Sequence, residues 1–114
     1  RVSKIKTLSK SYLGFGAIKH FKSKRPIMNL IDKVGGARSF ETTNIGCLVA
    51  GGKMDINVDA YGKIWDLAPF KLLIEEAGGR ITRLNGDEWT LEGRGAVMTN
   101  GILHKEAIEI LNKK

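Results

Sequence analysis

The chain has 114 residues, 42% of them hydrophobic and 27% charged, and its formal net charge is +7. This length and composition are typical of one small globular domain and leave no room for a second. The longest uninterrupted apolar stretch, Ile45 to Gly52, is too short to span a bilayer. No charged-then-apolar leader precedes that stretch, and Cys47 is the lone cysteine, so we expect a cytoplasmic protein.

The positive charge is concentrated in the first third of the chain. Up to Arg38 there are ten basic residues and one acidic residue, whereas from Ser39 onward there are nine basic and eleven acidic residues. Such a segment could contact nucleic acid, or it could be a solvated surface that attracts an anionic substrate. We favour the solvated surface, because the basic residues are scattered and no nucleic-acid motif accompanies them.

In the first half of the chain, short strand-like patterns alternate with longer helix-like ones, and glycines separate them. After Pro26, apolar residues recur at the i, i+3, i+4 and i+7 positions of one helical face and stop before Gly35. The elements expected here are a strand at Tyr12–Phe15, this helix, a strand at Ala37–Phe40, a helix from about Thr42 to Ala50, and a half-buried strand at Met54–Asp59.

The second half opens with a helix after Trp65. Asp66 is a good N-cap residue, and Pro69 is tolerated in a first turn because its missing N–H would have been unpaired there. The elements expected after this helix are a strand at Arg80–Leu84, a tight turn at Asn85-Gly86, a return strand at Trp89–Leu91, a strand at Ala96–Thr99 and a helix from about Gly101 to Asn112. This alternation predicts an α/β layer fold.

Three carboxylates are the candidates for chemistry. Asp59 ends a predicted strand and Asp66 opens a helix seven residues later, at the end of the sheet where sites in α/β folds gather. Two acids there could hold a divalent cation such as Mg²⁺ and a substrate hydroxyl, although spacing alone favours capping and surface roles. Asp55 is the third, and the isolated His20 and His104 are interpreted as surface or helix-start residues.

Two segments change that balance. Trp65-Asp66-Leu67-Ala68-Pro69, followed by Glu75-Glu76-Ala77-Gly78-Gly79, resembles the W-D-x-A … E-A-G-G signature of the inositol monophosphatase superfamily. Upstream, the run from Leu48 to Asp55 is similar to the family's L-V-A-x-G-x-x-D segment. Residues 2–16 and 103–111 resemble the strand before its glycine turn and its closing helix, so the resemblance covers essentially the whole chain.

The stretch from Arg38 to Thr42 resembles the family's R-x-x-G-[SD] motif. Its spacing to Asp55 is that of the histidinol-phosphatase-like branch, but Glu41 replaces the usual glycine and Thr42 the usual serine or aspartate. The substrate therefore stays open among sugar, inositol and histidinol phosphates and fructose bisphosphate.

The resemblance implies a role for several residues. Asp66 matches the aspartate that binds a catalytic Mg²⁺, and Asp59 matches the acidic residue that hydrogen-bonds a substrate hydroxyl or amine. Glu41 and Thr42 stand at substrate-binding positions of the R-x-x-G motif. Asp55 matches a repeated aspartate, for which we expect a structural role.

The family's Glu-Glu pair and its D-P-x-D-G-T motif do not occur in these 114 residues. The resemblance therefore implies that residues 1–114 are the C-terminal domain of a Mg²⁺-dependent phosphomonoesterase that uses metal-activated water, with its N-terminal half absent. We expect the fragment alone to be inactive and the whole enzyme to be a homodimer. The implied fold is a three-layer α-β-α domain with a mixed, mainly parallel sheet. The alternative is a non-catalytic fragment or paralogue that binds a partner or nucleic acid through its basic first third.

Overall fold

The computed structural model describes residues 1–39, 45–62, 64–90 and 94–113, without the side chains of residues 64–66. The elements in chain order are the short 3-10 helix η1 (Leu8–Lys10), β1 (Tyr12–Phe15), the 3-10 helix η2 (Ile18–His20), α1 (Arg25–Lys33), β2 (Gly36–Ser39), α2 (Ile45–Ala50), β3 (Ile56–Asp59), α3 (Ile64–Glu76), β4 (Arg80–Thr82), β5 (Ala96–Thr99) and α4 (His104–Leu111). No helix in the described part of the chain is both long enough and apolar enough to cross a membrane.

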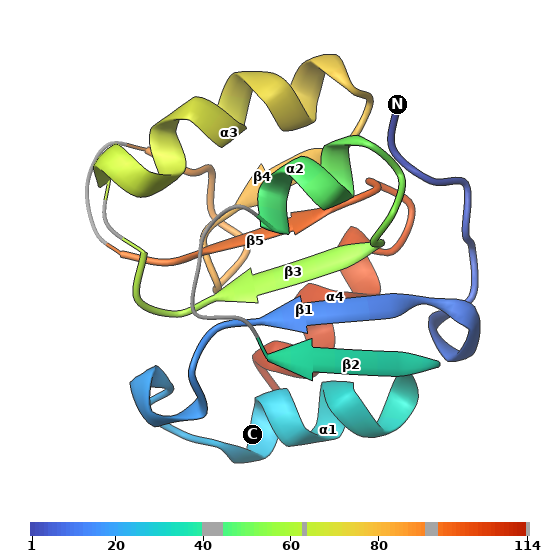
Figure 1. Ribbon diagram of the computed structural model, residues 1–114. Coiled ribbons are helices and arrows are strands. Elements are labelled where there is room, and N and C mark those ends of the chain that lie inside the picture. The colour runs from blue at the N-terminus through green and yellow to red at the C-terminus, as the bar shows by residue number, and fades with distance from the viewer. Residues whose placement is uncertain (40–44, 63, 91–93, 114) are drawn as a thin grey trace.

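The five strands form one sheet in the order β2-β1-β3-β5-β4 (Figure 1). β1 is parallel to both of its neighbours, and Leu13 faces Ala37 of β2 on one side and Ile56 of β3 on the other. β5 is antiparallel to both β3 and β4, so it alone among these strands runs against the others. The prediction of a mixed, mainly parallel sheet is confirmed.

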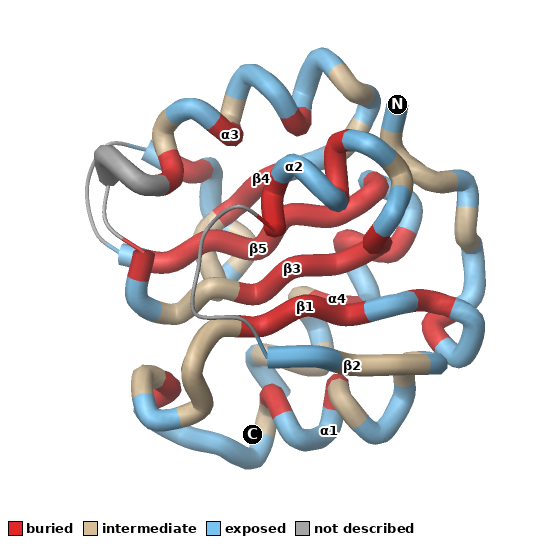
Figure 2. The backbone as a smooth tube through the Cα atoms, in the orientation of Figure 1, coloured by how far each residue is buried: buried red, intermediate tan, exposed pale blue. Residues whose placement is uncertain are grey.

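Helices cover both faces of the sheet, α2 and α3 on one and α1 and α4 on the other (Figure 1). Successive residues of a strand point to opposite faces, and the core divides accordingly. Leu13 and Val97 pack in the cluster under α1 and α4, whereas Ala96 and Met98 pack in the cluster under α2 and α3. The central strands β1, β3 and β5 are therefore largely buried, while β2 at the edge of the sheet and the outer helix surfaces are more exposed (Figure 2), and the three-layer architecture is confirmed.

Helix α3 begins at Ile64, three residues before the start that an N-cap at Asp66 predicts. Asp66 lies inside its first turn rather than at the N-cap, and Pro69 lies inside the helix. An interior proline removes one helical hydrogen bond. The helix nevertheless continues through it, because Leu67, Phe70 and Ile74 on one face are buried against the sheet and their packing stabilises the helical backbone.

The predicted return strand is wrong at the two positions the structure describes. The turn itself is present, with the Gly86 N–H donating to the Arg83 carbonyl at 3.0 Å and Gly86 at φ +93°. After it, pairing is limited to a single bridge between Thr82 and Glu88, and Trp89 and Thr90 are not in a strand. Trp89 is instead buried in the cluster under α2 and α3, so side-chain packing outweighs its strand propensity.

The remaining elements follow the predicted order with small shifts. β1 and β5 have the predicted bounds, and α4 begins at His104 rather than Gly101. Gly101 has φ +86°, which is not helical, and the Asn100 side-chain oxygen accepts the Leu103 N–H at 3.1 Å just before the helix. Phe40 of the predicted second strand and residues 42–44 of the predicted second helix lie outside the described residues.

Candidate active site

The carboxyl ends of β1, β2 and β3 lie side by side, because these three strands are parallel and adjacent. We call this end of the strands the Asp59 edge of the sheet, and the other end the opposite edge. The chain leaves β1 at Gly16, whose N–H donates to the Val58 carbonyl of β3 at 3.1 Å. Asp59 is the last residue of β3 at this edge, and α3 begins there five residues later (Figure 1). This is the position in the fold at which α/β sheets place their binding residues.

Asp59 is half-buried, and its carboxylate organises the turn that follows it. Its Oδ1 accepts the backbone N–H groups of Tyr61 at 2.9 Å and Gly62 at 2.7 Å. A Cβ at Gly62 would lie 2.9 Å from Asp59 Oδ2, so a larger residue there would force the Asp59 carboxylate to shift. An ionised carboxylate accepts about four hydrogen bonds, and Asp59 therefore keeps acceptor capacity for a substrate hydroxyl or amine.

The predicted metal ligand is placed only by its backbone. Asp66 lies in the first turn of α3, and its side chain is outside the described residues, as are Glu41 and Thr42. Their assigned roles stay predictions. Within the described part of the chain, no three side chains of histidine, cysteine, aspartate or glutamate are grouped so that they could hold a metal ion. Among the described residues, Asp59 therefore does not belong to a group of three possible metal ligands.

Asp55 lies at the opposite edge of the sheet, just before β3 begins. It is 4% exposed, and its carboxylate accepts the Tyr12 N–H at 2.7 Å and the Ser3 hydroxyl. Its carbonyl accepts the Asn100 N–H at 3.1 Å. These bonds tie the N-terminal segment and the end of β5 to β3, in agreement with the structural role expected for Asp55.

A cluster that the sequence analysis missed lies next to Asp59. The rings of His20 and Tyr61 stack with their centroids 4.2 Å apart and their planes inclined by 23°. The Arg94 guanidinium carbon lies 4.5 Å from the centroid of the same Tyr61 ring, a cation–π distance. We call these three residues the Tyr61 cluster. Its members follow β1, follow β3 and precede β5, so no pattern within one segment of the sequence indicates it.

His104 is the first residue of α4, as a helix-start interpretation predicts, but it is buried and not on the surface. Its ring lies between two hydroxyls, with Nε2 at 2.8 Å from Thr82 Oγ1 and Nδ1 at 2.9 Å from Thr99 Oγ1. Burial, and secondarily the charge of Arg80, lowers the pKa of His104 to about 4. Thr99 pairs with Ile56 at the start of β3. His104 is therefore remote from the Asp59 edge and serves packing.

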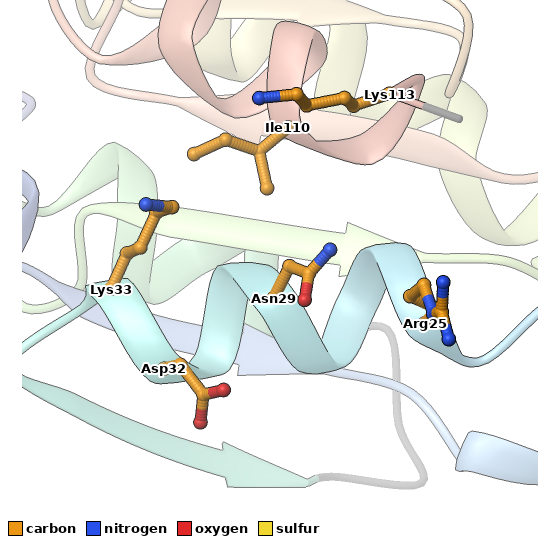
Figure 3. Close-up of a pocket in the computed structure, with 6 residues that line it drawn as sticks. All are labelled: Arg25, Asn29, Asp32, Lys33, Ile110 and Lys113. Atoms are coloured by element: carbon orange, nitrogen blue, oxygen red, sulfur yellow. The ribbon is translucent and has the colours of Figure 1, made fainter.

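A groove of about 640 Å³ lies elsewhere, between α1 and α4 (Figure 3). It is lined by Arg25, Asn29, Asp32, Lys33, Ile110 and Lys113. The lining contains three cationic side chains and one carboxylate, in agreement with the basic, solvated surface expected for the first third of the chain. The groove contains none of the predicted site residues and lies on the helical layer away from α3, so it is separate from the candidate active site.

Comparison with known proteins gives matches over nearly the whole chain. The model of the inositol monophosphatase family matches residues 9–114. A histidinol-phosphatase of Mycobacterium tuberculosis is 34% identical over 114 residues, which covers 97% of this chain and 44% of that relative. The extragenic suppressor protein suhB of Bartonella henselae has a structure with a TM-score of 0.89 at 25% identity, covering 99% of this chain and 45% of that one.

An IMPase/NADP phosphatase complexed with NADP and Ca²⁺ has the same fold, with a TM-score of 0.86 at 21% identity over 98% of this chain and 44% of that one. The chain thus spans less than half the length of each of these relatives. Because the family model matches residues 9–114, the chain belongs to the inositol monophosphatase family.

Proposed function

We propose that this chain is the C-terminal half of a Mg²⁺-dependent phosphatase that hydrolyses a small sugar, inositol or histidinol phosphate. The observation that carries the proposal is the half-buried carboxylate of Asp59, held at the carboxyl edge of β3 and followed at once by the helix that contains Asp66. The 34% identity to a histidinol-phosphatase supports a phosphomonoester as substrate.

In this proposal Asp59 binds the substrate and Asp66 binds the metal. Asp59 accepts a hydrogen bond from a hydroxyl or amine of the leaving group and so orients the phosphate ester. Asp66 provides one carboxylate oxygen to Mg²⁺, an ion that typically takes one or two carboxylates and completes its shell with water and phosphate oxygens. Bound Mg²⁺ would polarise the phosphate and lower the pKa of the attacking water.

The described donors fit part of such a site. Among the described residues they include one carboxylate at this edge and no cluster of three ligands. In this proposal the other ligands and the group that activates water come from the remainder of the protein. We expect the 114-residue chain by itself to bind Mg²⁺ weakly and to release no measurable phosphate.

Exposed apolar side chains on the outer surface of α2 and α3 support the proposal that the remainder of the protein covers this surface. Leu48 of α2 and Leu72 and Leu73 of α3 are 38%, 65% and 42% exposed, although α3 is apolar over most of its circumference. A helix that is apolar all round is normally buried on all sides. We propose that the portion of the protein matching the unmatched length of the relatives docks on this surface.

We also propose that the whole protein is a homodimer and that it is located in the cytoplasm. The free and exposed thiol of Cys47 fits a reducing compartment. The alternative of a non-catalytic module is favoured only by the basic groove between α1 and α4, which could bind a polyanion.

One substitution tests the proposal in the whole protein. Asp66→Asn should lower Mg²⁺-dependent phosphate release by several orders of magnitude, measured with histidinol phosphate and with inositol phosphates. The matched control is Glu106→Gln, since Glu106 is an exposed acid in the first turn of α4, in the other helical layer. Full activity of Asp66→Asn, or salt-sensitive binding to nucleic acid with no hydrolysis, would favour the non-catalytic alternative.

A further inference from the structure

The turn between Asp59 and α3 is fixed at three independent points. The Asp59 carboxylate holds the N–H groups of Tyr61 and Gly62. The Gly62 carbonyl accepts the Gly95 N–H at 3.0 Å, which ties the turn to the segment before β5. Gly95 has φ +83°, and a Cβ there would lie 2.7 Å from the Asp59 carbonyl, so this approach depends on glycine.

The third point is the side chain of Tyr61. It is 44% exposed, so burial alone does not fix its orientation. Its ring instead contacts His20 from the segment after β1 and Arg94 from the segment before β5. Stacked rings and cation–π pairs both have preferred geometries. The Tyr61 cluster therefore links three segments that reach the same edge of the sheet.

The position of this link matters because the turn is short. A single residue separates Gly62 from the start of α3, and Asp66 lies in the first turn of that helix. The turn that holds Tyr61 therefore lies directly before the first turn of α3 in the chain. A displacement of about 1 Å at a reacting centre can lower a rate about 100-fold.

We propose that Tyr61, held by His20 and Arg94, is a positioning residue that sets the position of the substrate-binding carboxylate of Asp59 relative to the first turn of α3, the turn that contains Asp66. This inference rests on the proposed phosphatase function. It assigns to the Tyr61 cluster no contact with substrate or metal; the cluster acts through the two aspartates.

The test uses the whole protein and measures kcat, the KM for the phosphate ester, and the Mg²⁺ concentration that gives half-maximal activity. Tyr61→Ala should lower kcat/KM about 10- to 100-fold and raise the Mg²⁺ concentration several-fold, because both aspartates move. Tyr61→Phe keeps the ring and with it the contacts to His20 and Arg94, so it should retain most of the kcat/KM that Tyr61→Ala loses. A residue with a merely structural role would lower the folded fraction and hence kcat, and would leave KM and the Mg²⁺ requirement unchanged.

Tyr12→Ala is the matched control. Tyr12 is also an exposed tyrosine, at 60%, but it lies at the start of β1, at the opposite edge of the sheet from Asp59. It should leave KM and the Mg²⁺ requirement unchanged. If Tyr61→Ala does not fold, Arg94→Gln and His20→Ala each remove one contact of the ring and should raise the Mg²⁺ requirement in the same direction.

The possible failures are distinguishable. An original protein without Mg²⁺-dependent hydrolysis overturns the proposed function itself, and the role of Tyr61 with it. An active original protein whose Tyr61→Ala, Arg94→Gln and His20→Ala variants keep the original KM and Mg²⁺ requirement overturns the positioning role alone.

Discussion

Thr99 Oγ1 lies 2.9 Å from Nδ1 of the buried His104 ring, and Thr82 Oγ1 on the other side of the ring favours the tautomer with the proton on Nε2. Thr99 Oγ1 already accepts the Gly101 N–H at 2.9 Å, which leaves its proton for the ring at 2.9 Å. On the other side, Thr82 Oγ1 donates to the Arg83 carbonyl and therefore accepts from Nε2. Protonation of Nδ1 would require the Thr99 hydroxyl to rotate and accept from the ring instead.

We therefore expect the domain to lose stability as the pH falls from about 6.5 to about 4. The pKa of His104 is lowered to about 4 by burial and by Arg80. Between these values the unfolded chain binds a proton that the folded chain does not, so acid favours unfolding. A difference of about 2.5 pKa units corresponds to about 3 kcal/mol, all of it present above pH 6.5.

Urea unfolding at a series of pH values measures this slope, with His104→Gln as the variant that removes it. His20→Gln is the control, because His20 is only half-buried and stacks on Tyr61 at the other edge of the sheet. Equal slopes for the original chain and His104→Gln would show that other groups produce the acid sensitivity.

Asn57→Val should stabilise the domain by roughly 1 kcal/mol. Asn57 is 2% exposed on β3, and its Oδ1 has no hydrogen-bond partner in the described structure. A buried acceptor without a partner costs about 1–3 kcal/mol, and valine has high strand propensity. The control is Asn100, which is equally buried but bonds Ile5 and Leu103. Asn100→Val should destabilise, as thermal melting of both variants would test.

Gly46→Ala should destabilise the contact between α2 and α3 by about 1–3 kcal/mol through overpacking. A Cβ at Gly46 would lie 2.5 Å from the Phe70 ring, which is itself buried. At Gly51 the nearest atom outside its neighbours is the Cys47 carbonyl oxygen at 3.3 Å, so Gly51→Ala is the milder control. Chemical denaturation of both variants gives the comparison, and similar losses at the two sites would contradict the packing argument.

Leu72→Ser combined with Leu73→Ser should lower the stability of the whole protein more than the stability of the 114-residue chain. These side chains are exposed in the chain, where the change leaves the melting temperature nearly unaltered. If the remaining half covers them, the same change removes buried apolar contacts and lowers the stability of the whole protein by about 2–5 kcal/mol. Ile102→Ser, at 48% exposure before α4, is the control. A whole protein as stable as the original would place the docking surface elsewhere.

The sequence predicted the layered fold because its signals are local. The bounds of β1 and β5 followed directly from their short apolar runs, and the helix after Pro26 from its spacing. The start of α3 did not follow, because Asp66 and Pro69 are residues that favour a helix beginning at that place. Only the buried contacts of Phe70 and its neighbours explain why the helix is longer.

The candidate site was predictable in part for the same reason. The place of Asp59 at the end of a strand is a local signal, and the structure agrees with it. The Tyr61 cluster depends instead on the pairing of β1 and β5 with β3, which brings distant segments to one edge. Single-sequence patterns carry no information about that pairing, so His20 was interpreted as a surface residue.

The bonds of Asn100 have a consequence for the order of folding. Its side-chain nitrogen donates to the Ile5 carbonyl at 2.9 Å and to the Ser3 hydroxyl at 3.1 Å, so it joins the first residues of the chain to a position near the end. Contacts of such long sequence separation close late and slow the search for the native state. During synthesis, β1 and β2 can pair early, but Ser3 and Ile5 can form these bonds only after β5 and Asn100 have emerged.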